Sequence, residues 1–178
     1  MNHADHVDLI RGGVSRAGSV WADLGSGSGA FTLALADLLG SGGVIYSVDR
    51  NARSLRDQAD AMRREFSDAQ LHQVLSDFTR PINLPPLDGV VAANALHFVR
   101  DKGAVLKLIH DTLKPGGRLV VVEYNTDRGN HWVPHPFSFG TFVMLADGAG
   151  FNGARQLSSR SSRFLNEMYS AVAFRGGS

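Results

Sequence analysis

A strand, a glycine-rich turn and a helix follow one another directly between residues 20 and 39. Short apolar residues run into the sequence D-L-G-S-G-S-G at residues 23–29, and apolar side chains then recur at helical spacing from Phe31 to Leu39. Glycine permits positive φ at such a turn and lets a ligand approach the backbone without meeting a Cβ atom. The start of a helix adds unpaired N–H groups that can face an anionic group. The stretch therefore predicts a ligand site at a strand-to-helix turn.

Strands and helices alternate along the rest of the chain. Further strands are expected at 44–48, 70–75, 87–94, 118–124, 154–157 and 168–174, and helices at 5–11, 52–66, 102–113 and 139–145. Strands that are joined by short right-handed crossovers lie parallel to one another. We therefore predict a single α/β domain over residues 1–178, with a doubly wound, mostly parallel seven-stranded sheet and an antiparallel C-terminal strand. The polar segment 158–166 is expected to join the last two strands.

The composition narrows the class of protein. With 178 residues the chain is long enough for one sizeable core, and a formal net charge of +1 gives no overall field that would favour nucleic acid. The absence of cysteine removes disulfides, thiolate metal sites and cysteine nucleophiles together. No apolar run is long enough to cross a bilayer, so no membrane partner is expected and the predicted location is cytoplasmic. With so small a net charge, nucleic acid is not expected as a partner either.

Asp49 follows the second predicted strand and lies 24 positions after Gly25. Neighbouring parallel strands bring Asp49 to the same edge as the glycine turn, at a spacing close to that at which an acid meets a ribose diol. Gly25, Gly27 and Ala30 also satisfy G-x-G-x-x-A, an allowed form of the dinucleotide fingerprint. These residues predict a bound nucleoside, but they do not by themselves exclude an NAD(P)-linked oxidoreductase.

The acid at position 23 and the glycine at position 29 extend the pattern to D-x-G-x-G-x-G, which closely resembles motif I of the class I S-adenosylmethionine (SAM)-dependent methyltransferases. The sequences A-N-A-L-H at 93–97 and L-K-P-G-G at 113–117 also resemble that family. Because proline stops a helix and glycine takes the left-handed position at its end, L-K-P-G-G is expected to be a structural turn. The resemblance implies a Rossmann-like methyltransferase fold with SAM as the cofactor and S-adenosylhomocysteine (SAH) as the product.

The resemblance also implies which residues hold the cofactor. In that family the glycine loop wraps the methionyl end of SAM, and the acid before the glycines fixes the loop and the amino group; here that acid is Asp23. The ribose role falls to Asp49 and the adenine amino group to Asp77, so three acidic strand ends are expected around one hollow. The predicted cofactor-binding residues are Asp23, Gly25, Ser26, Gly27, Gly29, Asp49, Arg50, Asp77, Phe78 (against the adenine ring) and Asn94.

The acceptor implied by the resemblance is a small molecule. A-N-A-L-H is found in many small-molecule methyltransferases and differs from the N/D-P-P-Y/F signature of amino-directed nucleic-acid enzymes. The polar, aromatic and proline-punctuated segment 125–137 is predicted to be the acceptor loop. Methyl transfer depends mainly on holding donor and acceptor in line, and a base is needed only where the acceptor must lose a proton. The candidate catalytic bases are His97, His131 and His135, with Glu123 and Tyr124 behind them, although each alone is more often a packing or hydrogen-bonding residue.

Several alternatives stay open on sequence alone. A SAM-binding regulatory protein without catalysis would share the whole cofactor site with an enzyme. The N-terminal segment 1–18, with its short helix, can be a lid over the cofactor or simply pack on the domain. The acceptor pocket must come from this helix, the 125–137 loop or a second subunit of a homodimer. No metal site is expected at His131 and His135, because the prolines beside them prevent a regular helix.

Overall fold

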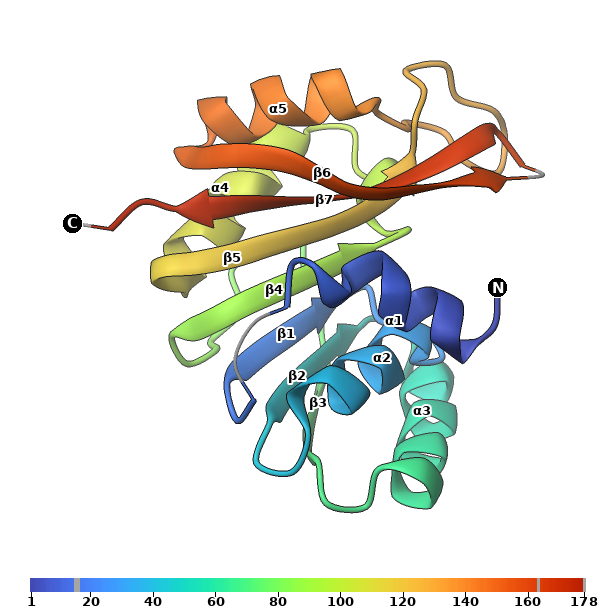
Figure 1. Cartoon of the computed structure of the whole chain (residues 1–178), viewed down its shortest axis with the longest axis vertical. Coiled ribbons are helices and arrows are strands. Elements are labelled where there is room, and N and C mark those ends of the chain that lie inside the picture. The colour runs from blue at the N-terminus through green and yellow to red at the C-terminus, as the bar shows by residue number, and fades with distance from the viewer. Residues whose placement is uncertain (15–16, 163, 178) are drawn as a thin grey trace.

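The computed structural model describes residues 1–14, 17–162 and 164–177. Its elements, which Figure 1 labels, are α1 (His3–Arg11), β1 (Val20–Leu24), α2 (Ala30–Leu39), β2 (Val44–Asp49), α3 (Ala52–Glu65), β3 (Gln70–Leu75), β4 (Leu87–Ala93), the 3-10 turn η1 (Leu96–Phe98), α4 (Lys102–Thr112), β5 (Leu113–Tyr124), α5 (Phe139–Gly148), β6 (Phe151–Ser162) and β7 (Asn166–Arg175). Residues 15, 16, 163 and 178 lie outside the described part, so the predicted segments 1–18 and 158–166 are described only in part.

One seven-stranded sheet runs through the molecule in the order β3-β2-β1-β4-β5-β7-β6. The first five strands are parallel, and β7 pairs antiparallel with both β5 and β6. The chain starts in the middle of the sheet with β1, builds outward on one side to β3, and then crosses back to β4 on the other side. This order confirms the predicted α/β fold with its antiparallel C-terminal strand, and it places the switch in direction between β1 and β4.

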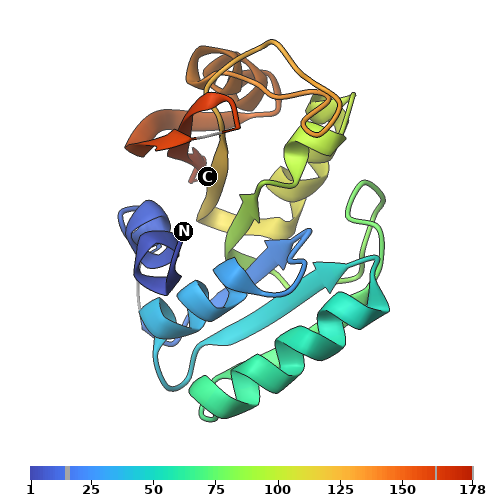
Figure 2. The same cartoon turned by 90° about the vertical axis from the view of Figure 1, so that its right-hand side faces the viewer.

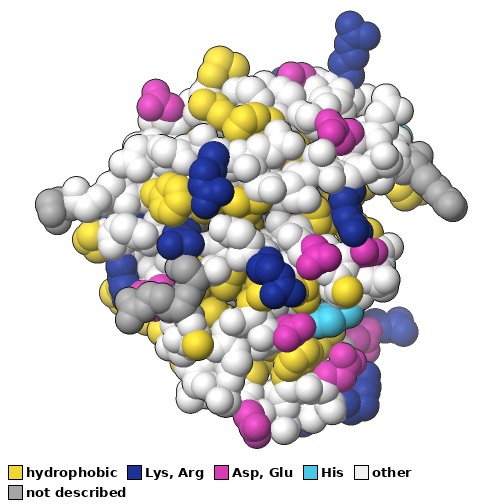
Figure 3. Space-filling model, viewed as in Figure 1, with side chains coloured by type: hydrophobic (Ala, Val, Ile, Leu, Met, Phe, Trp, Pro, Cys, Tyr) yellow, Lys and Arg dark blue, Asp and Glu magenta, His cyan; other side chains and the backbone are white. Residues whose placement is uncertain are grey.

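Helices cover both faces of the sheet. The apolar sides of α1, α2 and α3 form one core with Trp21, Ile45 and Val91, and α4 and α5 form the other core with Ala22, Val90 and Val121. Figure 2 shows α1 and α2 to the left of the sheet and α4 to its right. Acidic and basic side chains are interspersed over the face that α1, α2 and α3 cover (Figure 3). Because successive side chains along a strand point to opposite faces of the sheet, each strand contributes residues to both cores.

The helix α1 packs along α2. Its residues Leu9 and Ile10 are fully buried, and the ring of His6 meets that of Phe31 edge-on at 4.9 Å between centroids. Arg160 of β6 pairs with Asp5 of α1. The helix begins at His3, earlier than expected, because the side chain of Asn2 accepts a hydrogen bond from the Asp5 N–H in a capping box.

The strands β5 and β6 extend furthest beyond the ranges expected from the sequence. The strand β5 begins at Leu113, not at residue 118, because L-K-P-G-G forms a bulge within the strand: Leu87 is paired with Leu113 and Gly89 already with Arg118. Gly116 has the expected left-handed φ of 75°. The polar segment 158–162 continues β6, because Ser158 pairs with Ser170 and Ser162 with Asn166. An edge strand tolerates such polar residues because only the side chains on the face that packs against the core have to be buried.

Candidate functional site

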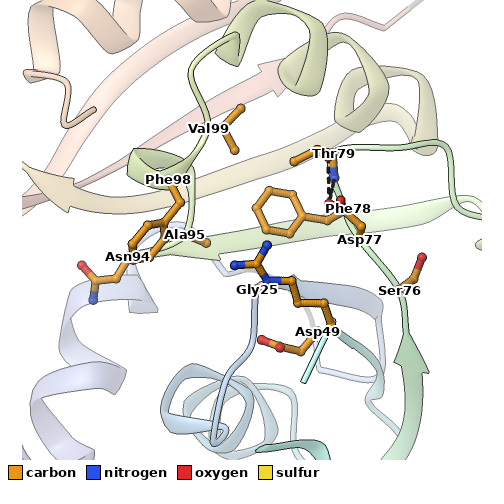
Figure 4. A pocket seen from close by; sticks show the side chains of 11 residues that line it. Gly25, Asp49, Ser76, Asp77, Phe78, Thr79, Asn94, Ala95, Phe98 and Val99 are labelled. Atoms are coloured by element: carbon orange, nitrogen blue, oxygen red, sulfur yellow. Dashed lines mark hydrogen bonds between the residues drawn. The ribbon is translucent and has the colours of Figure 1, made fainter. Parts of the chain in front are cut away.

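A cavity of about 460 Å³ opens at the carboxyl ends of β1, β2, β3 and β4. Its walls come from the glycine turn, the segments that follow β2 and β3, and η1. The residues that line it are Gly25, Asp49, Arg50, Ser76, Asp77, Phe78, Thr79, Asn94, Ala95, Phe98 and Val99. Figure 4 shows the ring of Phe78 in the middle of the view, with Asn94 and Phe98 to its left and Asp77 to its right. A crevice outside the carboxyl ends of parallel strands, where the strand order reverses, is the usual ligand site of such sheets.

Gly25 forms the part of the wall where a side chain has no room. Its φ is 71°, and a Cβ atom there would lie 2.7 Å from the Ala95 Cβ and 3.1 Å from the Phe78 Cε1. Gly27 also has positive φ, at 53°, but no atom lies within 4 Å of its Cβ position. The two glycines therefore have different structural roles. Gly25 lets β1, η1 and Phe78 approach one another, whereas Gly27 leaves open space beside the backbone.

Asp49 ties the glycine turn to the start of α3. Its Oδ2 accepts the Gly27 N–H at 2.8 Å and its Oδ1 accepts the Asn51 N–H at 2.8 Å. An ionised carboxylate has about four lone-pair positions, so two remain for further donors. Because Asp49 and Arg50 both line the cavity, these acceptors lie beside it.

Asp77 and Phe78 follow β3 as predicted. The Asp77 Oδ1 accepts hydrogen bonds from the Thr79 N–H at 2.9 Å and the Thr79 Oγ1 at 2.7 Å, drawn as dashed lines in Figure 4. These bonds hold the pKa of Asp77 below its usual range. The carboxylate is therefore a fixed, ionised acceptor at the cavity wall.

Asn94 closes β4 in a conformation that few residues other than glycine adopt. Its φ is 51°, and its N–H donates to the Val122 carbonyl oxygen at 2.8 Å. The side-chain Oδ1 is buried and has no hydrogen-bond partner among the described residues. A buried acceptor without a partner is costly, so an unpaired oxygen in the wall of a cavity points to a donor on a bound molecule.

Asp23 lies behind the glycine turn, so the structure corrects the expectation of three acids around one hollow. Of the three, only Asp49 and Asp77 line the cavity. Asp23 is 1% exposed, and its Oδ2 accepts a hydrogen bond from the Thr32 Oγ1 of α2 at 2.6 Å. Burial raises the pKa of Asp23 to about 7. This side chain therefore acts on the turn from inside the protein, and its direct contact with a cofactor stays a prediction.

A buried chain of hydrogen bonds connects Asp23 with the glycine turn. The Gln58 Nε2 donates to the Thr32 Oγ1 at 2.7 Å, the Ser47 Oγ donates to the Gln58 Oε1 at 2.6 Å, and the Ser26 Oγ lies 2.7 Å from the Ser47 Oγ. Since the Ser47 hydroxyl proton is used on Gln58, Ser26 must be the donor in the last pair. The side chain of Ser26 thus points into the protein, which leaves only its backbone for a ligand.

Gly29 gives Gln58 its place in this network. A Cβ atom at Gly29 would lie 2.5 Å from the Gln58 Cγ, and the φ of Gly29 is 95°. The third glycine therefore allows α3 to approach the start of α2. Gln58 was missed in the sequence, although the signal is visible: Leu55, Gln58 and Met62 share the buried face of α3, where a glutamine without a partner would be unfavourable.

The three candidate bases have different surroundings. The His97 side chain is 4% exposed, and its Nδ1 lies 2.8 Å from the Oε2 of Glu123, which is fully buried. His131 and His135 are exposed, and none of the three histidines is among the residues that line the cavity. The predicted acceptor loop meets the site through its backbone, because the His135 N–H donates to the His97 carbonyl oxygen at 3.0 Å. Among the described residues, no three His, Asp or Glu side chains are grouped so as to hold a metal ion.

The arrangement fits an adenosyl group with a cationic tail. Asp49 supplies free acceptor positions, Phe78 supplies a flat apolar wall, and Asn94 supplies an unpaired buried oxygen. The family model of a methyltransferase domain matches residues 15–140. The chain belongs to this methyltransferase domain family. The match confirms the predicted class I, SAM-dependent domain with SAM as its cofactor, and the NAD(P)-linked alternative gains no support.

Curated methyltransferases resemble part of the chain. A ubiquinone/menaquinone biosynthesis C-methyltransferase, UbiE, from Haemophilus ducreyi is 31% identical over 111 residues, which cover 62% of this chain and 43% of the relative. A 2-phytyl-1,4-naphtoquinone methyltransferase from Nostoc punctiforme is 25% identical over 120 residues, covering 65% of this chain and 51% of the relative. The chain thus spans about half the length of these relatives.

Solved structures share the fold at low sequence identity. The YcgJ protein of Bacillus subtilis superposes with a TM-score of 0.79 at 11% identity, over 99% of this chain and 100% of that one. A magnesium protoporphyrin IX methyltransferase from Synechocystis with bound SAM gives 0.71 at 17% identity, over 90% and 71%. In the described part of this chain, no helix has the length and apolar character that a membrane span requires.

Proposed function

We propose that this chain transfers the methyl group of SAM to a small-molecule acceptor by in-line displacement. The observation that carries the proposal is the cavity of about 460 Å³, in which Gly25, Asp49 and Asp77 meet at the carboxyl ends of three neighbouring strands. When bound there, SAM would supply an electrophilic methyl carbon on a sulfonium sulfur. The protein then has to bind SAM and the acceptor, orient them in line and exclude water.

The proposed roles follow from the acceptors and space around the cavity. The free lone pairs of the Asp49 carboxylate take the two ribose hydroxyls, and Asp77 accepts from the adenine amino group beside the Phe78 ring. The open space beside the Gly27 backbone accommodates the methionyl end of SAM. The unpaired Oδ1 of Asn94 accepts a donor from that end. Arg50 lines the cavity as well. The backbones of Ser26 and Gly29 and the buried Asp23 support this turn from behind.

For the acceptor, we propose an aromatic ring. Phe98 lines the cavity and is 61% exposed, and Trp132 in the 125–137 loop is 72% exposed, so flat apolar surface is available on the acceptor side. The curated relatives that are named for quinone substrates favour the same class. The lid role of α1, a homodimer, a cytoplasmic location and the absence of a nucleic-acid partner stay predictions.

Calorimetric titration with SAH and with NAD tests the cofactor assignment. Wild type is expected to bind SAH in preference to NAD, and Asp49→Ala to bind SAH at least about tenfold more weakly, as expected for one lost charge-assisted contact. Asp57→Ala, an exposed acid of α3, is the matched control and should bind as wild type does. Preferential binding of NAD, or an unchanged SAH affinity in Asp49→Ala, would contradict the proposal.

A second measurement separates an enzyme from a SAM-binding regulator. Wild type with SAM and 1,4-dihydroxynaphthalene should release SAH, detected by chromatography. Tight SAH binding without SAH release from this acceptor or from a panel of phenols would favour the non-catalytic alternative.

A further inference from the structure

His97 occupies the stretch of chain that forms one wall of the cavity. It lies in η1; His97 itself is not among the residues that line the cavity, but Ala95, two residues before it, and Phe98, directly after it, do line it. Its ring centroid is 4.2 Å from that of Phe98 and 5.9 Å from that of Tyr124. The imidazole is therefore almost shielded from water, and it lies against Phe98, which faces the space where substrates would meet.

Glu123 of β5 holds His97 by two hydrogen bonds at once. One carboxylate oxygen, Oε1, accepts the His97 backbone N–H at 3.1 Å, and the other, Oε2, lies 2.8 Å from the ring Nδ1. This double contact fixes both the backbone and the ring orientation of one residue. A carboxylate can only accept, so a neutral imidazole held in this way carries its ring proton on Nδ1 and its lone pair on Nε2.

Lys102 is a second basic group near the Glu123–His97 pair. Lys102 is 8% exposed, donates to the Val99 carbonyl oxygen at 2.8 Å and lies 5.2 Å from the centroid of the Phe137 ring. Burial lowers the pKa of Lys102, and its attraction to Glu123 acts in the opposite direction.

Two tyrosines complete the titratable surroundings of this pair. Burial, followed by the negative charge of Glu123, raises the pKa of Tyr124 and of Tyr169, which lies opposite Glu123 on β7. Both hydroxyls therefore stay neutral across the physiological range. In this cluster of Glu123, His97, Lys102 and the two tyrosines, the neutral imidazole is the group that carries a basic nitrogen lone pair.

We propose that Glu123 is a positioning residue that keeps the Nε2 of His97 unprotonated, so that His97 takes the proton of an acceptor whose nucleophilic atom carries one. This inference rests on the proposed function and narrows its acceptor class to molecules such as phenols and quinols. The acceptor oxygen forms its bond to the methyl carbon as the carbon–sulfur bond breaks. The sulfur keeps that electron pair, and the O–H proton passes to Nε2.

The tautomer of His97 can be read directly by ¹⁵N nuclear magnetic resonance on the whole protein with SAH. Wild type should show a protonated Nδ1 and an unprotonated Nε2. In Glu123→Gln the amide oxygen can still accept the His97 backbone N–H, but the amide N–H₂ must donate to Nδ1, which moves the ring proton to Nε2. His110, whose Nδ1 lies 3.2 Å from Asp111, is the internal control and should not change. A protonated Nε2 in wild type, or the same tautomer in both proteins, overturns the inference.

Turnover then tests the acceptor class. Wild type should methylate 1,4-dihydroxynaphthalene, which has acidic protons, and not trimethylamine, which has none to give. His97→Gln and Glu123→Gln should lose about 100-fold in turnover, the low end for a general base, with SAH affinity unchanged. The rate of wild type should decline at low pH, where the base becomes protonated, and this decline should disappear in His97→Gln. Glu123→Asp should recover part of the rate that Glu123→Gln loses.

The possible failures are distinguishable. Loss of SAH binding in wild type contradicts the proposed function itself. Turnover of neither probe likewise contradicts the proposed function. Intact SAH binding with an unchanged pH profile in His97→Gln, or with turnover of trimethylamine alone, overturns the role of the Glu123–His97 pair.

Discussion

Replacing Asp23 by asparagine should make the protein more stable at neutral and alkaline pH. The pKa of this buried carboxyl is raised by burial from 3.8 to about 7, whereas the hydrogen bond from Thr32 acts in the opposite direction. The unfolded chain releases the proton near 3.8, so between these two pKa values the folded protein holds one proton more. The stability that this group contributes is therefore complete below pH 3.8, declines as the pH rises and is lost above about pH 7.

The size of the effect follows from the two pKa values. The difference between 3.8 and about 7 corresponds to about 4 kcal/mol, at about 1.4 kcal/mol for each pH unit. Asparagine has the shape of a protonated aspartic acid and can still accept from Thr32, but its amide N–H₂ also needs an acceptor, which reduces the gain. We expect Asp23→Asn to be about 1–4 kcal/mol more stable than wild type at pH 8 and no more stable at pH 4.

Urea unfolding between pH 4 and 9 measures this difference. Trp21 is fully buried and lies two residues before Asp23, so its fluorescence reports on the same part of the core. Carboxylates with lowered pKa, such as Asp77 and Asp111, destabilise both proteins equally in acid, so the difference between the two proteins isolates Asp23. Asp147→Asn on the exposed side of α5 is the control. A difference that stays constant from pH 4 to 8 would refute the reasoning.

Two further substitutions test the packing around the site. Gly29→Ala should lower the free energy of unfolding by at least about 2 kcal/mol in urea, because φ is 95° and the new Cβ meets Gln58 at 2.5 Å; Gly140→Ala, where the nearest atom is at 3.9 Å, should cost much less. Tyr169→Phe should raise the melting temperature, because it removes a fully buried hydroxyl that has no hydrogen-bond partner in the described part of the chain; leaving such a group unpaired costs about 1–3 kcal/mol. A lower melting temperature for this variant would mean that the hydroxyl does have a stabilising partner.

The cofactor side of the molecule could be predicted well because its signals are local. Glycines at alternate positions, an acid directly after β2 and another after β3 are each set by strand ends, and parallel strands bring their carboxyl ends to one edge. Asp49 and Asp77 therefore meet at the cavity as expected. Asp23 does not line the cavity because side chains alternate between the two faces of β1. Its side chain lies on the face that α2 and α3 cover, where it meets Thr32.

The acceptor side could not be predicted to the same depth because it depends on contacts between distant segments. Nothing in the local pattern around His97 reveals that Glu123, 26 residues away, clamps both its backbone and its ring. Gln58 likewise joins three elements through its side chain, although its place on the buried face of α3 was readable. His131 and His135 were attractive by residue type alone, and the turns of the loop decide their exposure.

The strand β7 lies between β5 and β6, and this position has a consequence for how the chain assembles. A chain emerging from the ribosome can pair β1 to β5 as they appear, but β6 has no neighbour in the sheet before residues 166–175 arrive. Until then the apolar side of β5, including Val120 and Val122, lacks its final cover. The domain therefore closes last at its far end, and a truncation there exposes a long unpaired strand edge to aggregation.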